Sequence, residues 1–306
     1  MSKNPFSVLI IEDDPYASDL MMTLLARDYR TQVIAELSNR VSLEVFGSLS
    51  DLRGRKNSSR DEDGFFKEDF AKSIDVVILD TEVPWNIDLP FQVAKKISTW
   101  ANPPRILFMA THPNIDAIEN YMANSCFSGY VLKEEVLYGL ASAVCLAAKG
   151  YCVITPGVRS LVEHKFARSK FPVETLMISS PGMADIRKEC DEIEKQIIRL
   201  GLLFDLPQHD IHDEMGFSET KVAKTMSKGY LDLLIPDIVS NKISLEELFN
   251  NPYIDNNKIV NHYQAILKEL PQHLERRRAV TKSPKFRGMS TLAFHLLTRL
   301  DIQKWC

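Results

Sequence analysis

The first half of the chain alternates short apolar runs with stretches of helical periodicity. Residues 6–12 (FSVLIIE), 75–80 (DVVILD) and 105–110 (RILFMA) are almost wholly apolar, as strands buried on both faces of a parallel sheet are. Two further strands are predicted at 32–36 and 128–132, and helices at about 16–28, 90–101, 114–124 and 134–149. This alternation predicts βαβ units and an α/β, doubly wound, parallel sheet of five strands.

Four of the predicted strands deliver a polar residue at or just past their carboxyl ends: Asp13, Asp80, Thr111 and Lys133. Ligands of open parallel sheets bind at this edge. Carboxylates that converge there repel one another unless a divalent cation neutralises them, and hard oxygen ligands suit Mg²⁺. A lysine and a threonine nearby can hold the oxygens of a phosphoryl group carried by one carboxylate. The residues therefore predict an aspartyl-phosphate site.

The motifs around these residues resemble the receiver domain of two-component response regulators. They read IIEDDP at 10–15, VVILDTEVP at 76–84, FMATHP at 108–113 and GYVLKE at 129–134. All stand in the family's order within residues 6–149, which implies a receiver domain over residues 1–149. Each residue alone has a plainer interpretation, such as a helix cap or a solvated charge, but their joint order favours the receiver.

The resemblance also implies a role for each matching position. Asp80 is the phosphoacceptor, and Thr111 and Lys133 contact the phosphoryl oxygens. Tyr130 is the aromatic switch residue that changes rotamer when Thr111 moves. The Mg²⁺ ligands implied are Glu12, Asp13, Asp80 and the backbone carbonyl of Glu82.

The chain departs from the receiver pattern by an excess of residues between the first acids and Asp80. The excess lies at about 40–72 and includes GRKNSSRDEDG, a polar stretch typical of a loop or disordered insertion. Two interpretations stay open for it, a solvated decoration and a surface that docks a partner.

A second domain is predicted at 183–306, after a linker at 150–182. Its most informative stretch, 206–234, predicts a helix at Gln208–Met215, a turn at Gly216 and a second helix with Ser218 as its N-cap. Two short helices joined by a glycine turn form a helix-turn-helix. The stretch resembles the NarL/LuxR-type output domain and region 4 of sigma factors, although His212 replaces the usual small alanine. The second domain is therefore expected to be all-α.

The second helix of this motif is expected to enter the major groove of DNA. Helices predicted at about 257–278 and 289–300 form a C-terminal extension, and the basic stretch 275–288 between them could act as a phosphate-contacting arm. The flanking helices could equally form a dimer interface. The candidate DNA contacts are Ser218, Glu219, Thr220, Lys221, Lys224, Thr225, Lys228, Arg276, Arg277 and Arg278.

Composition and charge narrow the remaining function classes. The length of 306 residues suits two modest domains. The net charge is −4, but residues 258–306 are basic, with ten Lys and Arg against three Asp and Glu. The five cysteines show no metal-ligand spacing. No apolar run is long enough to span a bilayer, and the first residues run directly into a strand, so a cytoplasmic protein without a signal peptide is expected. The second half lacks the residue clusters of an output enzyme.

The sequence thus predicts a DNA-binding transcriptional regulator controlled by phosphorylation. Its only chemistry would be Mg²⁺-dependent self-phosphorylation at Asp80. The expected partners are a histidine kinase, double-stranded DNA and a second copy of the chain, with RNA polymerase as a further candidate and no membrane. Two alternatives stay open, in which the C-terminal helices bind a protein or RNA.

Overall fold

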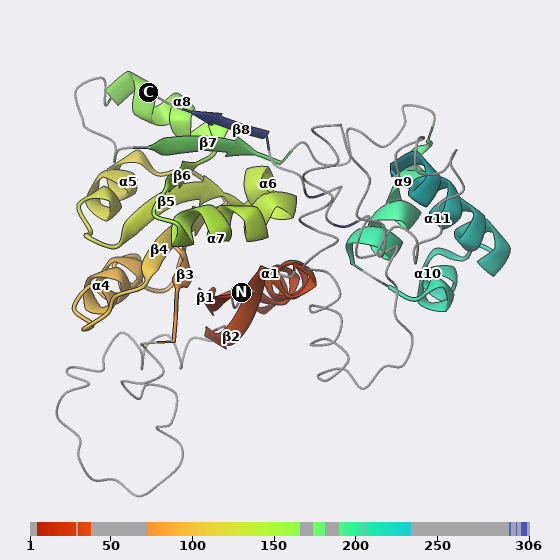
Figure 1. Ribbon diagram of the computed structural model, residues 1–306, viewed down its shortest axis with the longest axis horizontal. Helices are drawn as coiled ribbons and strands as arrows, with labels where there is room; N and C mark the ends of the chain where they lie inside the picture. Colours follow the sequence, from red (N-terminus) through yellow and green to blue (C-terminus); the bar gives the residue numbers. More distant parts are fainter. Residues whose placement is uncertain are drawn as a thin grey trace, which may run out of the picture. The chain divides into compact units, whose positions relative to one another are not determined.

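The computed structural model describes residues 5–28, 30–37, 73–165, 174–180, 190–204, 206–233, 294, 298 and 301–304. The chain divides into two compact units (Figure 1). One unit, called here the sheet unit, comprises Asn4–Ser180 and Leu300–Cys306. The other, called the helical unit, comprises Pro181–Arg299 with Met1–Lys3.

The described residues of the sheet unit form an eight-stranded sheet in the order β2-β1-β3-β4-β5-β6-β7-β8. Neighbouring strands are parallel except for the last pair, in which β8 runs antiparallel to β7. The strands are β1 Phe6–Ile11, β2 Thr31–Leu37, β3 Val76–Asp80, β4 Arg105–Ala110, β5 Phe127–Leu132, β6 Cys152–Ile154, β7 Thr175–Ser179 and β8 Asp301–Lys304.

The prediction of a five-stranded sheet is wrong, although β1–β5 lie within one residue of their predicted bounds. Three more strands extend the sheet beyond β5. β6 and β7 fall in the predicted linker, 150–182, and β8 falls in the predicted helical extension. β6 has three residues and β8 reads DIQK, so neither carries enough apolar or alternating pattern to predict a strand. The sheet therefore continues past residue 149, where the predicted receiver domain ends.

Helices cover both faces of the sheet (Figure 1). Residues of α1 and α7 pack with Val76 and Ile78 of β3 on one face, and residues of α4, α5 and α8 pack with Val77 and Leu79 on the other. The predicted helix 134–149 is interrupted by a 3-10 turn at Leu137–Gly139. The helices are α1 Pro15–Arg27, α4 Leu89–Ile97, α5 Ile115–Met122, α6 Lys133–Val136, α7 Leu140–Ala148 and α8 Pro156–Lys165.

The pairing of β5 with β6 depends on a glycine. Gly129 has φ 144°, and a Cβ placed there would lie 2.0 Å from the carbonyl oxygen of Val153. Only glycine permits this backbone and this close approach. Gly129 therefore lets the added strands pair with β5 directly beside Tyr130.

The helical unit contains α9 Glu192–Ile198, a π-helical turn at Arg199–Leu203, α10 Gln208–Met215 and α11 Glu219–Leu233. Asp191 caps α9 through a reciprocal capping box with Glu194. Where the side chains of these helices are described, the buried apolar ones are Ile197, Ile198, Ile211, Val222 and Met226. α10 has the bounds that the sequence predicted, and α11 begins directly after Ser218, as predicted.

Several predictions fall on residues that the structure does not describe. The insertion at about 40–72 and the helix at about 257–278 lie outside the described residues, as does the basic stretch 275–288. The helix predicted at about 289–300 is described only at residues 294 and 298. In the described part of the chain, no helix is long and apolar enough to cross a membrane.

Candidate functional site

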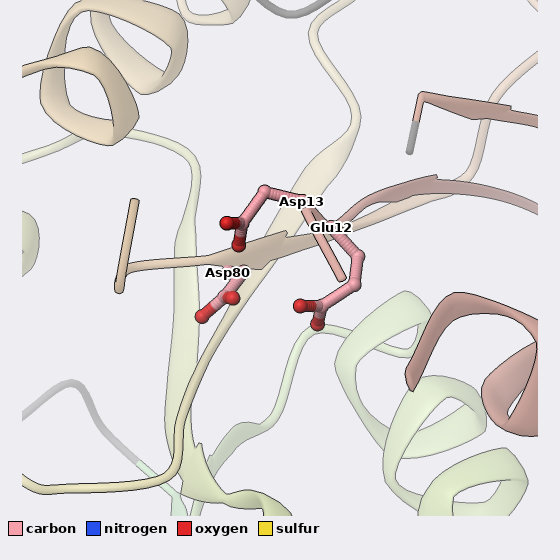
Figure 2. A group of neighbouring side chains, drawn as sticks. All are labelled: Glu12, Asp13 and Asp80. Carbon is pink, nitrogen blue, oxygen red and sulfur yellow. The ribbon is translucent and has the colours of Figure 1, made fainter. Parts of the chain in front are cut away.

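Three carboxylates gather where β1 and β3 end (Figure 2). β1 and β3 are adjacent and parallel, with Ile11 opposite Leu79, so their carboxyl ends meet. Glu12 and Asp13 follow β1, and Asp80 is the last residue of β3. One ligand oxygen from each carboxylate lies within 4.8 Å of the others. The sequence prediction that these three residues converge is therefore confirmed.

Lys133 supplies the positive charge at this site. It is the first residue of α6, directly after β5, and its Nζ lies 2.9 Å from Glu12 Oε2 and 3.0 Å from Asp80 Oδ2. Burial would lower the pKa of Lys133, but the charges of Asp80 and Glu12 outweigh it and raise that pKa. Lys133 therefore stays protonated between the two buried carboxylates.

The site remains short of positive charge, because one lysine faces three carboxylates. Burial, followed by the neighbouring carboxylate of Glu12, raises the pKa of Asp80 from 3.8 to about 7. Burial, followed by the charge of Asp80, raises the pKa of Asp13 to about 6. Glu12 Oε2 is buried and, among the described residues, makes no hydrogen bond although it is close to Lys133 Nζ. Such a set of oxygen ligands fits Mg²⁺.

Glu82 links the end of β3 to the end of β4. Its backbone N–H donates to Asp80 Oδ1 at 3.1 Å, and its carboxylate accepts from the backbone N–H groups of Thr111, at 2.6 Å, and His112, at 2.8 Å. Partial burial would raise the pKa of Glu82, but these hydrogen bonds outweigh it and lower that pKa. Thr111 is exposed at the rim of the site, so the Glu82 carboxylate fastens the loop that carries it.

Tyr130 points into the sheet unit and is fully buried. Its hydroxyl lies 3.0 Å from Thr81 Oγ1, and the Thr81 hydroxyl donates to the carbonyl oxygen of Met109 at 3.2 Å. Its ring centroid is 6.3 Å from that of Tyr121. The predicted switch residue is thus connected to the residue after Asp80, while its change of rotamer stays a prediction.

The predicted DNA-contacting residues divide by exposure. Ser218 Oγ accepts from the backbone N–H of Lys221 at 3.2 Å, which confirms Ser218 as the cap of α11. Thr225 is 4% exposed, so its predicted contact with DNA is wrong. It lies one turn after Val222 and beside Met226, on the face that packs into the helical unit. The exposed predicted contacts on α11 are Glu219, Thr220, Lys221 and Lys224.

Four predicted contacts are not described at the level of side chains. Lys228 belongs to α11, but its side chain lies outside the described residues. Arg276, Arg277 and Arg278 also lie outside them. Their proposed phosphate contacts stay predictions.

The turn between α10 and α11 is organised by three residues. Gly216 ends α10 in the left-handed conformation, with φ 67° and its N–H bonded to the carbonyl oxygen of His212. The ring of His212 hydrogen-bonds the carbonyl oxygen of Phe217, which gives the unusual histidine a structural role. Lys221 Nζ lies 4.1 Å from the centroid of the Phe217 ring. The turn therefore orients a lysine of the first turn of α11.

Sequence reasoning missed the contacts that two side chains make near the predicted phosphorylation site. Glu82 was predicted as a ligand only through its carbonyl oxygen, yet its carboxylate binds the amides of Thr111 and His112. Thr81 was assigned no role, although its hydroxyl is a partner of Tyr130. Both contacts join strand ends across the sheet, and no local pattern encodes them.

We expect Mg²⁺ to stabilise the fold more at pH 8 than at pH 5. The pKa values of Asp80 and Asp13 in the fold, about 7 and about 6, exceed the ordinary value of 3.8. Without metal, the stability from these groups is therefore present below about pH 4 and lost as the pH rises toward 7. Mg²⁺ binds the ionised carboxylates, and a tenfold excess over its Kd would add about 1.4 kcal/mol at pH 8.

Thermal melts at pH 5 and pH 8, with and without millimolar Mg²⁺, measure this effect. The double variant D13N/D80N is the control and should not respond to Mg²⁺. If Mg²⁺ leaves the melting temperature of the wild type unchanged at both pH values, the predicted metal site is contradicted.

Comparison with known proteins gave similar solved structures, whereas no family model and no curated protein matches the sequence. The chain is similar to the response regulator ChrA of a heme-sensing two-component system (19% identity, 76% of this chain and 91% of that chain, TM-score 0.38). It is also similar to the response regulator RcsB of Salmonella typhimurium (16% identity, 75% and 92%, TM-score 0.39). A third is the receiver domain of a NarL response regulator from Mycobacterium tuberculosis (19% identity, 48% and 99%, TM-score 0.36).

Proposed function

We propose that the chain is a two-component response regulator of the NarL/LuxR type, in which phosphorylation of Asp80 controls DNA binding by α10 and α11. The observation that carries this proposal is the arrangement at the strand ends. Glu12, Asp13 and Asp80 converge within 4.8 Å, and Lys133 lies between two of them. One carboxylate can accept a phosphoryl group there while the others hold a cation.

The proposed chemistry is a transfer of one phosphoryl group to Asp80. An oxygen of the ionised Asp80 carboxylate attacks the phosphorus of a phosphohistidine on a kinase, the P–N bond breaks, and its electron pair leaves with the imidazole. The three carboxylates and the carbonyl oxygen of Glu82 would hold Mg²⁺, whose charge would offset the negative charge of the phosphoryl oxygens. Lys133 already pairs with Asp80 at 3.0 Å and is placed to contact the added group.

The change in charge at Asp80 would then bias the protein between two states. The hydroxyl of Thr111 would approach the phosphoryl group, and Tyr130 would change rotamer in response. The Glu82 carboxylate holds the backbone N–H of Thr111, so this contact would resist any accompanying movement of the Thr111 backbone. The Glu82 contact is therefore part of the unphosphorylated state in this proposal.

The proposed output is recognition of duplex DNA by α11. Thr220 and Lys221 are exposed in the first turn of this helix, and Lys224 is exposed one turn later. The first turn of a helix in the major groove reaches base edges, while lysines on its flank neutralise phosphates. A homodimer would present two such helices to paired half-sites, and RNA polymerase is a further proposed partner.

One observation favours a second candidate, a helix pair that binds a protein. Asp213 and Glu214 are exposed on α10, close in sequence to the lysines of α11. Acidic groups beside a DNA-binding helix repel phosphates and would suit a basic protein surface instead.

Binding measurements on the phosphorylated chain separate these candidates. The full chain is treated with acetyl phosphate and Mg²⁺, and its affinity for duplex DNA selected from genomic fragments is measured over a range of salt concentrations. We expect phosphorylation to tighten this affinity by about tenfold, a typical coupling between sites. If RNA is bound as tightly as the selected DNA, an RNA partner is favoured. If neither nucleic acid is bound, a protein partner is favoured.

A further inference from the structure

Two of the chain connections between the helical unit and the sheet unit start from neighbouring strands. The chain leaves the sheet after β7, at Ser180, and returns at Leu300 before β8. Ser179 of β7 is paired in register with Asp301 of β8. These two connections therefore begin at the same end of one strand pair.

A single turn of helix connects the phosphorylation site to this point. Lys133, the first residue of α6, forms ion pairs with Glu12 and Asp80. Two residues later, the carbonyl oxygen of Glu135 accepts a hydrogen bond of 2.9 Å from the backbone N–H of Ser180. α6 has only four residues, so Lys133 and Glu135 are expected to move together.

The side chain of Glu135 fixes the same turn to the added part of the sheet. Both carboxylate oxygens accept from the backbone N–H of Gly157 in the first turn of α8, at 2.9 and 3.0 Å. A carboxylate at the beginning of a helix also interacts favourably with the helix dipole. Just before α6, the backbone N–H of Leu132 donates to the hydroxyl of the buried Thr155 at 3.0 Å. The segment from Leu132 to Glu135 is thus tied to β6, to α8 and to the end of β7.

We propose that Glu135 is a positioning residue that couples the state of Asp80 to the junction at Ser180. The inference rests on the proposed phosphorylation of Asp80. Phosphorylation changes the partners of Lys133 and displaces its side chain. This displacement passes along α6 to the carbonyl oxygen and the carboxylate of Glu135. The Gly157 contact holds the carbonyl oxygen of Glu135 in register with Ser180, so the junction responds to the site. The signal then leaves through the strands added beyond β5.

Amide hydrogen exchange on the full chain tests this coupling. Wild type and E135A are phosphorylated with acetyl phosphate in Mg²⁺. Amide exchange is then followed in peptides that cover residues 154–158 and 174–181. In wild type, phosphorylation should change the exchange of the Gly157 and Ser180 amides. In E135A, labelling should be retained, while the phosphorylation-dependent difference in exchange falls by about threefold or more.

Matched variants separate coupling from a purely structural role. Loss of packing alone would raise exchange in both states of E135A and leave the difference between them intact. E134A removes the exposed carboxylate of the preceding residue and should behave as wild type. E135Q keeps one acceptor oxygen and should give an intermediate difference, and this variant decides the question if E135A does not fold.

The outcomes distinguish the coupling from the proposed function. Normal labelling with no exchange difference in wild type overturns the coupling alone, as does a difference of wild-type size in E135A or E135Q. Failure of wild type to be labelled overturns the proposed function and the coupling with it.

Discussion

The variant D80N is expected to accept no phosphoryl group from acetyl phosphate in Mg²⁺. The amide of asparagine has no carboxylate oxygen to attack phosphorus. Asp80 is buried, and its two carboxylate oxygens accept hydrogen bonds from Lys133 Nζ and from the backbone N–H of Glu82. Neither of the other two carboxylates, Glu12 and Asp13, combines these three properties. Glu12 and Asp13 are therefore not expected to replace it. Radiolabelling or intact mass after exposure to acetyl phosphate measures the loss.

The same variant should be more stable than wild type in the absence of metal at pH 8. Burial and Glu12 raise the pKa of Asp80 to about 7, so its ionised form is disfavoured in the fold. An uncharged amide removes this penalty and should raise the free energy of unfolding by about 1–3 kcal/mol. A variant that melts higher yet takes no label has lost the acceptor and not the fold. D19N, which changes an exposed aspartate of α1, is the control. Labelling of D80N at the wild-type level would contradict the assignment of Asp80 as the phosphoacceptor.

The double variant K221A/K224A is expected to lose most of its affinity for duplex DNA. Both lysines are exposed on α11. Removing Lys221 from the first turn should cost roughly 1–3 kcal/mol on the preferred site, because that turn reaches base edges. Removing Lys224 should weaken binding to all sequences and reduce the salt dependence by about one unit. Binding curves at several salt concentrations measure both effects.

Three further variants sharpen this prediction. K149A removes an exposed lysine from the sheet unit and should leave the salt dependence unchanged. T225A removes a buried hydroxyl and should lower the stability of the helical unit without changing the specificity of DNA binding. Replacing Arg276, Arg277 and Arg278 together should resemble the loss of Lys224 if the basic stretch also contacts phosphates. Unchanged DNA affinity in the folded double variant would favour a protein partner for α10 and α11.

The sequence was most informative where chemistry and topology coincide. Parallel strands bring their carboxyl ends to one edge, so residues as distant as Glu12 and Lys133 could be expected to meet, and they lie 2.9 Å apart. α10 and α11 were equally predictable, because Gly216 and Ser218 are strong local signals for the end of one helix and the beginning of the next.

The sequence failed where structure depends on pairing between distant segments. β8 is polar and pairs with a strand more than a hundred residues earlier, which no local pattern encodes. Thr225 has the polarity of a surface residue, but its position relative to Val222 places it on the buried face. The Glu135 contacts with Gly157 and Ser180 depend on β6, α8 and β7, so they could not be predicted once residues 150–182 were interpreted as a linker.

The position of β8 has a consequence for synthesis of the protein on the ribosome. β7 emerges about 120 residues before β8, which at typical elongation rates corresponds to on the order of ten seconds. During that interval the TLMIS strand, which carries no charge, is an open edge able to pair with other chains. Nascent chains should therefore aggregate or require chaperones most while the helical unit is being translated, and a lysine introduced in β7 would protect them at the expense of the mature sheet.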